Sequence, residues 1–211
     1  MKKILLIDDD YSILSLYSKF TEITGHIPVT ATDLSECMDV LERNTPDLIL
    51  LDILMQPEDG WEILGNIRKK NFSKDLPVII LTAKTPLQSE VQRYGAMIDG
   101  YLMKPVTHRV FRQKIDRFFD SAHKIRAFSE VLDKKDVSKC IINEYRSVCR
   151  QYRFLCDIIE IYERENLSLE ITTFDKRNIC NNNPEDSKEI GNIKASILKS
   201  RLRIKEIECL A

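Results

Sequence analysis

Short runs of apolar and β-branched residues alternate with stretches of helical periodicity throughout the first 120 residues of the chain. Such runs are typical of strands buried on both faces of a parallel sheet, and the stretches between them supply the crossover helices. The alternation therefore predicts an α/β domain over residues 1–120 with five parallel strands and five helices. We expect the strands at 3–7, 27–31, 47–51, 77–81 and 100–102, and the helices at 11–24, 33–43, 59–70, 86–95 and from 106 onward.

The pattern changes after residue 120, where no further buried strand run appears and apolar residues recur in steps of three and four. The first such stripe runs from Phe111 to Leu132, so the last helix of the first domain is expected to continue past the domain. We therefore predict a second, mainly helical region over residues 121–211, with coiled-coil-like packing.

A second stripe, from Ile141 to Tyr162, predicts a helix over about 137–165. Asn183 followed by Pro184 and two acidic residues has the chemistry of a helix start, and it predicts a final helix over about 184–209. Between these helices we expect a short strand at 168–174 and a polar loop at 181–183.

Polar residues follow four of the five predicted strands. Asp8 and Asp9 end the first strand, Asp52 ends the third, Thr82 ends the fourth, and Lys104 follows the fifth. In an open parallel sheet, ligands bind outside the carboxyl ends of the strands. Taken singly, each of these residues is an ordinary helix cap, strand end or solvated charge, but together they predict one functional site.

Three carboxylates held together repel one another unless a cation neutralises them. A ligand set made of oxygen atoms, without cysteine or histidine, favours Mg²⁺ over zinc, and Mg²⁺ in proteins is commonly shared with phosphate oxygens. The sequence therefore predicts Mg²⁺ and a phosphorylated partner. Lys104 and the Thr82 hydroxyl can bind phosphoryl oxygens, and Asp52 can act as the nucleophile that forms an acyl phosphate.

Four segments, in this order and at these separations, give the first 120 residues a specific resemblance to the receiver domains of two-component response regulators. They are ILLIDDD at 4–10, LILLDILMQPEDGWEIL at 48–64, VIILTAK at 78–84 and GYLMKP at 100–105. The resemblance implies a flavodoxin-like fold with strand order 2-1-3-4-5, and phosphorylation of Asp52 by a histidine kinase or a small phosphodonor.

Carried over by position, the resemblance implies that Asp9, Asp52 and the backbone carbonyl of Leu54 bind Mg²⁺ directly, and that Asp8 acts through water. Thr82 and Lys104 would bind the phosphoryl group. Tyr101 matches the family's aromatic switch, which turns inward when the threonine is drawn toward the phosphate. The peptide bond before Pro105 matches one that is usually cis in this family. The loop after Asp52 departs from the family, because its proline is displaced to Pro57.

The output of the switch is open among three classes. The favoured one is a helical module that forms a homodimer or docks a downstream protein. The alternative is a DNA-binding transcription regulator with an atypical output domain, in which Arg201, Arg203 and Lys205 could serve, although no helix-turn-helix spacing is evident. An enzymatic output is disfavoured because no nucleotide-binding loop, metal motif or catalytic triad follows residue 120. We expect a phosphoacceptor switch rather than an enzyme.

Composition sets the remaining expectations. The formal charge is −1, which is not the basic excess of a dedicated nucleic-acid binder. The six cysteines form no C-x-x-C pair, and no apolar run approaches the length of a membrane span. We therefore expect a cytoplasmic protein with reduced thiols and no membrane contact.

Overall fold

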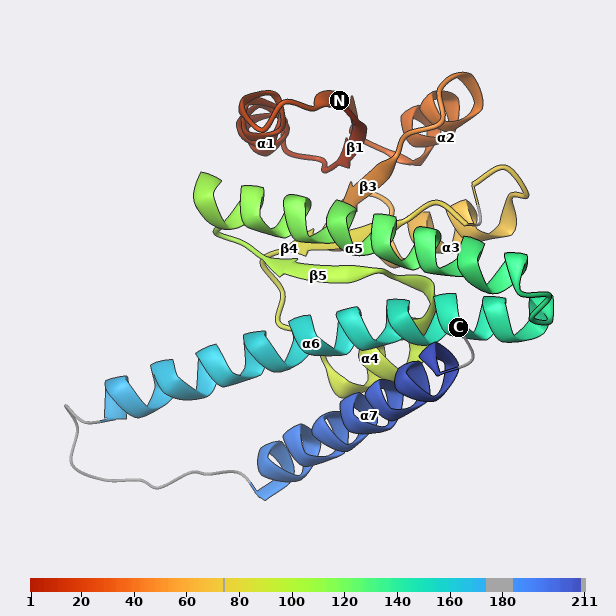
Figure 1. Ribbon diagram of the computed structural model, residues 1–211. Helices are drawn as coiled ribbons and strands as arrows, with labels where there is room; N and C mark the ends of the chain where they lie inside the picture. The colour runs from red at the N-terminus through yellow and green to blue at the C-terminus, as the bar shows by residue number, and fades with distance from the viewer. Residues whose placement is uncertain (74, 174–183, 210–211) are drawn as a thin grey trace. The chain divides into compact units, whose positions relative to one another are not determined.

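The computed structural model describes residues 1–73, 75–173 and 184–209 of the 211-residue chain (Figure 1). The chain divides into two compact units, each of which is described by itself. The first contains Met1–Thr85 and Met97–Ser121, and the second contains Pro86–Ala96 and Ala122–Ala211.

The first unit contains a five-stranded parallel sheet with the order β2-β1-β3-β4-β5, as predicted. The strands lie within about one residue of their expected bounds, because each is a run of apolar residues bounded by polar ones. They are β1 (Lys3–Ile7), β2 (Ile27–Ala31), β3 (Leu48–Leu51), β4 (Val78–Thr82) and β5 (Gly100–Met103).

Alternate residues of the strands point to opposite faces of the sheet. On one face, Ile4 and Leu6 of β1 join Leu48 and Leu50 of β3 in an apolar cluster. Helices α1 (Tyr11–Ile23) and α5 (His108–Lys134) cover this face, with Phe111 of α5 fully buried in the cluster. The apolar residues of β1, β3 and β4 that point to the opposite face are also buried, as expected for a parallel sheet covered on both faces.

Aspartates begin three helices of the first unit by accepting backbone hydrogen bonds. Asp10 accepts from the Ser12 amide at 2.7 Å and caps α1. Asp33 caps α2 (Leu34–Arg43), and Asp59 caps α3 (Gly60–Lys69). Each cap satisfies an amide at a helix start that has no partner within the helix, and thereby fixes where the chain leaves the site end of the sheet.

The second unit consists of α4 (Gln88–Tyr94), the later part of α5, α6 (Lys139–Thr173) and α7 (Pro184–Glu208). Its helical character confirms the prediction for the C-terminal region, and α5 does run past residue 120. Residues Leu132, Ile142, Tyr145, Cys149 and Ile207 form its apolar cluster.

The predicted strand at 168–174 is wrong, because residues 168–173 continue α6 and residue 174 lies outside the described residues. The β-branched run Ile171-Thr172-Thr173 suggested a strand, but strand propensity is weak beside the continuation of a long helix. The loop predicted at 181–183 also lies outside the described residues, whereas the helix start at Pro184 is confirmed. In the described part of the chain, none of the helices is both long and apolar enough to cross a membrane.

Candidate functional site

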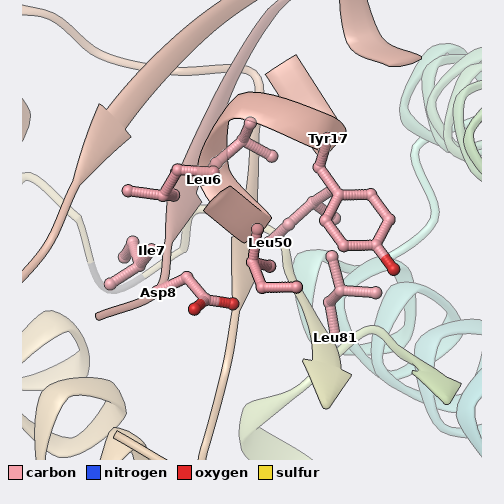
Figure 2. Close-up of a pocket in the computed structure, with 8 residues that line it drawn as sticks. Leu6, Ile7, Asp8, Tyr17, Leu50 and Leu81 are labelled. Carbon is pink, nitrogen blue, oxygen red and sulfur yellow. The ribbon is translucent and has the colours of Figure 1, made fainter. Parts of the chain in front are cut away.

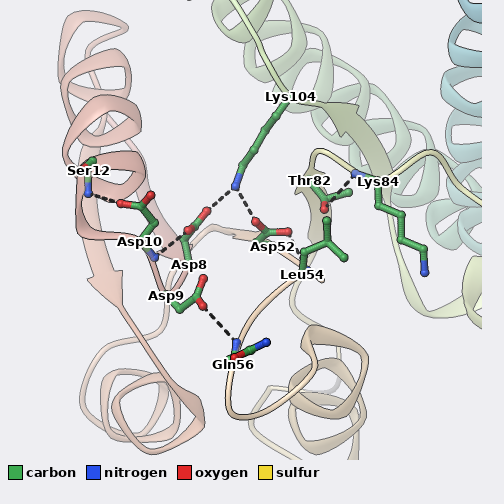
Figure 3. Close-up of polar contacts among 10 residues, drawn as sticks. All are labelled: Asp8, Asp9, Asp10, Ser12, Asp52, Leu54, Gln56, Thr82, Lys84 and Lys104. Carbon is green, nitrogen blue, oxygen red and sulfur yellow. Dashed lines mark hydrogen bonds and ion pairs between the residues drawn. The ribbon is translucent and has the colours of Figure 1, made fainter.

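The polar residues predicted at the strand ends meet at the carboxyl edge of the sheet (Figure 3). Lys104 follows β5, and its Nζ lies 2.5 Å from Asp8 Oδ2, after β1, and 2.6 Å from Asp52 Oδ2, after β3. The two carboxylate residues are only 5% and 7% exposed. The structure therefore brings together three of the predicted groups as a buried, ion-paired cluster with one ammonium shared by two carboxylates.

The second oxygen of each buried carboxylate accepts a backbone amide. Asp8 Oδ1 accepts from the Asp10 amide at 3.0 Å, and Asp52 Oδ1 accepts from the Leu54 amide at 2.9 Å. Both carboxylates are thus oriented by their own loops as well as by Lys104. An ion pair removed from water is held most firmly when its remaining lone pairs are satisfied in this way.

Asp9 lies apart from this cluster. Its side chain is exposed, and its Oδ2 accepts from the backbone amide of Gln56 at 3.1 Å in the loop after β3. Leu54, whose carbonyl was predicted as a ligand, is also exposed. The structure therefore places Asp9 at the same edge of the sheet, bonded to the β3–α3 loop rather than to the ion pair.

Asp8 stands over an apolar hollow between the sheet and α1 (Figure 2). Burial raises the pKa of Asp8 above its ordinary value of 3.8, although the hydrogen bonds from Lys104 and the Asp10 amide oppose that rise. Burial by itself lowers the pKa of Lys104, but its hydrogen bonds to Asp52 and Asp8 outweigh this effect and raise the pKa above 10.5. Lys104 is therefore a permanent cation, and burial makes the ionised form of Asp8 less favourable. The hollow is lined by Leu6, Ile7, Asp8, Ile13, Leu14, Tyr17, Leu50 and Leu81.

The donor set fits a divalent cation in chemistry and charge. Two buried carboxylates share one ammonium, so the cluster carries an excess negative charge that a hard cation would neutralise. Among the described residues, no three His, Cys, Asp or Glu side chains are already gathered as a metal cluster. A third carboxylate would come from Asp9, which would have to turn from the Gln56 amide toward Asp52.

Thr82 and Tyr101 are both buried and meet through the backbone of Lys84. The Lys84 amide donates to Thr82 Oγ1 at 3.4 Å, and the Tyr101 hydroxyl donates to the Lys84 carbonyl at 2.7 Å. Tyr101 therefore lies inward, with its hydroxyl on the loop that follows β4. Sequence reasoning missed this role of Lys84, because a backbone amide and carbonyl have no residue-type signature.

Gly60 is a second residue whose role at the site sequence reasoning missed. A Cβ built on Gly60, the first residue of α3, would collide with the backbone carbonyl oxygen of Asp52 and lie 2.6 Å from Ile53 Cα. Helix α3 can therefore begin directly against the end of β3 only because this position lacks a side chain. The Asp-Gly pair at 59–60 was the available signal, since it joins a helix cap to a residue that permits close approach.

The peptide bond between Lys104 and Pro105 is cis, as the resemblance implied, and so is the bond between Gln56 and Pro57. The model of the response regulator receiver domain family matches residues 4–116. The chain belongs to this family. The family accounts for the sheet order and for the segments that carry the strand-end aspartates, threonine and lysine.

Relatives of this receiver domain include several transcription regulators. The alkaline phosphatase synthesis transcriptional regulatory protein PhoP of Bacillus subtilis is 28% identical over 171 residues, which are 81% of this chain and 67% of PhoP. The DNA-binding dual master transcriptional regulator RpaA of Synechocystis is 34% identical over 105 residues, which are 50% of this chain and 44% of RpaA. The match thus spans less than half of RpaA.

Among solved structures, the response regulator TrrA of Thermotoga maritima, in complex with Mg(2+)-BeF, is 30% identical with a TM-score of 0.50. The similarity covers 56% of this chain and 99% of that one.

Replacing Asp8 by Asn should stabilise the metal-free protein, because it removes a buried carboxylate whose pKa burial has raised. Since the folded pKa exceeds the unfolded one, Asp8 favours folding below about pH 3.8, and this contribution is lost as pH rises through the folded pKa. The free energy of unfolding of wild type should therefore fall relative to Asp8→Asn as pH is raised from about 3.5 to 7, measured by urea denaturation with a chelator.

Asp10→Asn is the matched control with the opposite sign. The Ser12 amide lowers the pKa of Asp10, so its contribution to stability is present above about pH 3.8 and is lost as pH falls through the folded pKa. Parallel pH curves for wild type and Asp8→Asn would contradict the electrostatic description of the site.

Proposed function

We propose that this receiver domain is a Mg²⁺-dependent phosphoacceptor switch in which Asp52 receives the phosphoryl group. One observation carries the proposal: Lys104 Nζ is held between Asp8 and Asp52 at the carboxyl edge of the sheet. A buried carboxylate beside a fixed ammonium has the arrangement that phosphoryl transfer requires, because most of that catalysis is positioning and charge neutralisation. The Mg(2+)-BeF complex of TrrA supports the same reading.

In the proposed reaction an Asp52 carboxylate oxygen attacks the phosphorus of the donor. The bond between that phosphorus and the donor's leaving atom breaks, the electron pair departs with the donor, and an acyl phosphate forms. Asp9, Asp52 and the Leu54 carbonyl would hold Mg²⁺ directly, and Asp8 would hold it through water. The bound Mg²⁺ would neutralise charge on the phosphoryl oxygens. In the structure the Asp9 carboxylate is turned away from this arrangement and accepts a hydrogen bond from the Gln56 amide.

In the next step of the proposal, Lys104 changes its hydrogen-bond partner from Asp52 to the phosphoryl group. Phosphorylation removes the charge of the Asp52 carboxylate, while the phosphoryl group brings roughly two negative charges to the same edge. The ammonium is 2.6 Å from Asp52 Oδ2 and can transfer its hydrogen bond to a phosphoryl oxygen with a small side-chain movement. The Thr82 hydroxyl would donate to another oxygen, and this movement would reach Tyr101 through Lys84.

The partner that supplies the phosphoryl group is proposed to be a histidine kinase in the cytoplasm. The proposed output is a homodimer formed through the helical region, with coiled-coil-like packing of its helices or docking of a downstream protein. Leu198 and Leu202 support this reading, because they lie one turn apart on α7 and are 59% and 54% exposed. Leu155, in the stripe from Ile141 to Tyr162, is buried within the second unit and is not available for such an interface.

A transcription regulator is the second candidate, favoured by the printed description of RpaA as DNA-binding. In this chain, however, Arg203 makes a two-pronged ion pair with Glu144, at 2.7 and 2.9 Å, and also contacts Glu206. An arginine bound to two carboxylates is poorly placed to read base edges. Arg201 and Lys205 remain exposed, but with Arg203 engaged by two carboxylates we favour the helical interaction module.

Incubation with acetyl phosphate should label the protein only when Mg²⁺ is present, and Asp52→Ala should abolish the label. Asp59→Asn is the matched control, because asparagine keeps the cap of α3 and this residue lies outside the ion-paired cluster. Thr82→Ala should still be labelled, since its hydroxyl senses the phosphate rather than accepting it. Mass spectrometry of the intact protein measures each case, and full labelling of Asp52→Ala would show that another residue carries the phosphate.

The output is tested by sedimentation at tens of micromolar protein, with and without beryllofluoride. The unmodified protein should sediment as a dimer, and joint replacement of Leu198 and Leu202 by Glu should give a monomer. Val131→Glu, on the exposed face of α5, is the control and should leave the dimer intact. A monomer under both conditions contradicts dimerisation, and nonspecific DNA retention by that monomer would favour the transcription regulator.

A further inference from the structure

Helix α4 belongs to the second unit, although its sequence lies within the segment matched by the receiver family model. Residues Pro86–Ala96 group with the C-terminal helices rather than with the strands that precede and follow them. Two contacts to α6 show how this grouping is made, one at each end of the α4 segment.

At the start of the segment, the Tyr162 hydroxyl of α6 donates a hydrogen bond to the Pro86 carbonyl at 2.7 Å. Pro86 itself is buried. The carbonyl precedes the first residue of α4 by two positions, so this bond ties α6 to the residue just before the N-cap of α4.

At the end of the segment, Gly95 packs on the ring of Phe154 from α6. Its φ of −57° is ordinary helical backbone that any residue adopts, so the turn does not require glycine. A Cβ at this position, however, would lie 2.8 Å from Phe154 Cε1, and the Phe154 side chain is only 1% exposed. Glycine is therefore needed for the close approach of α6 and for nothing in the backbone.

The β4–α4 segment is thus held by two tyrosines. The Tyr101 hydroxyl binds the carbonyl of Lys84, and the Tyr162 hydroxyl binds the carbonyl of Pro86 two residues further on. The Lys84 amide is bonded in turn to Thr82. The carbonyls of Lys84 and Pro86, which the two tyrosines bind, are therefore two residues apart on the segment that follows Thr82.

From these contacts we infer that α6 is an internal docking partner of α4, and that phosphorylation of Asp52 releases it by moving the segment from Thr82 to Pro86. The docking half stands on the contacts of the second unit alone, whereas the release half rests on the proposed function. Docking keeps the α6-facing side of α4 covered in the resting protein. Release uncovers that side together with Tyr162 and Phe154 of α6.

Hydrogen–deuterium exchange of the amides in α4, measured on the full chain, tests docking in the resting protein. Tyr162→Phe removes only the hydroxyl, and loss of one hydrogen bond should make these amides exchange about two- to tenfold faster. Tyr152→Phe is the matched control on the same helix, because its hydroxyl is bonded to Cys156, and it should leave α4 unchanged. Equal exchange in wild type and Tyr162→Phe would overturn the role of this bond.

Gly95→Ala gives an independent test in which two explanations predict opposite signs. Helix propensity favours alanine and would slow exchange in α4, whereas the clash with Phe154 should separate the helices and accelerate it. Gly65→Ala in α3 meets no atom within 4 Å and is the control. Adding Phe154→Leu to Gly95→Ala should restore part of the protection, and slower exchange in Gly95→Ala alone would overturn docking.

Beryllofluoride with Mg²⁺ tests release in wild type, with Asp52→Ala as the negative control. Exchange in α4 should rise at least to the level of Tyr162→Phe, while exchange near residues 52–60 should fall. If only residues 52–60 respond, the phosphoacceptor site stands and release is overturned. If neither segment responds, release fails together with the proposed function, and the resting-state variants still decide docking.

Discussion

The site depends on one ammonium group shared by two buried carboxylates. Lys104 follows β5 at the carboxyl edge of the sheet. Its side chain reaches past the intervening strand β4 to Asp8 and Asp52, which follow the neighbouring strands β1 and β3. A single cation for two carboxylates leaves the edge negatively charged. In the proposed function a divalent cation would offset this excess, and the same ammonium would then bind phosphoryl oxygens.

A series of hydrogen bonds also lies along residues 82–86, which follow β4 at this edge. The Lys84 amide donates to Thr82 Oγ1, and the Tyr101 hydroxyl donates to the Lys84 carbonyl. Two residues further on, the Tyr162 hydroxyl donates to the Pro86 carbonyl. The two tyrosine bonds are 2.7 Å long, whereas the Lys84–Thr82 contact is long at 3.4 Å, and the residues that make these bonds are buried or partly buried. The proposed release of α6 from α4 would use this segment to convert a change of charge at Asp52 into a change at α4.

The sheet could be predicted closely because its strands are uninterrupted apolar runs, such as Leu48–Leu51, ended by aspartates. That Asp52 and Lys104 share one edge could be predicted for the same reason, since parallel strands bring their carboxyl ends together, but their direct ion pair was not predicted. The Lys84 link could not, because it uses backbone atoms. The close packing of Gly95 on Phe154 could not be predicted either, since a glycine near the end of a helical stretch is common and does not indicate a packing partner. The strand expected at 168–174 failed because local propensity was weaker than the helix already running through it.

The central claim is that Lys104 supplies the positive charge on which the buried edge depends, and that a divalent cation can substitute for part of it. Urea denaturation of Lys104→Met and of wild type, each titrated with Mg²⁺ from a chelated start, measures this most directly. Without Mg²⁺ the variant should lose about 3 kcal/mol in free energy of unfolding, because two buried carboxylates are left without a counterion. Mg²⁺ should then stabilise the variant more than wild type. Equal stability of the two proteins in chelator, with equal responses to Mg²⁺, would contradict the account.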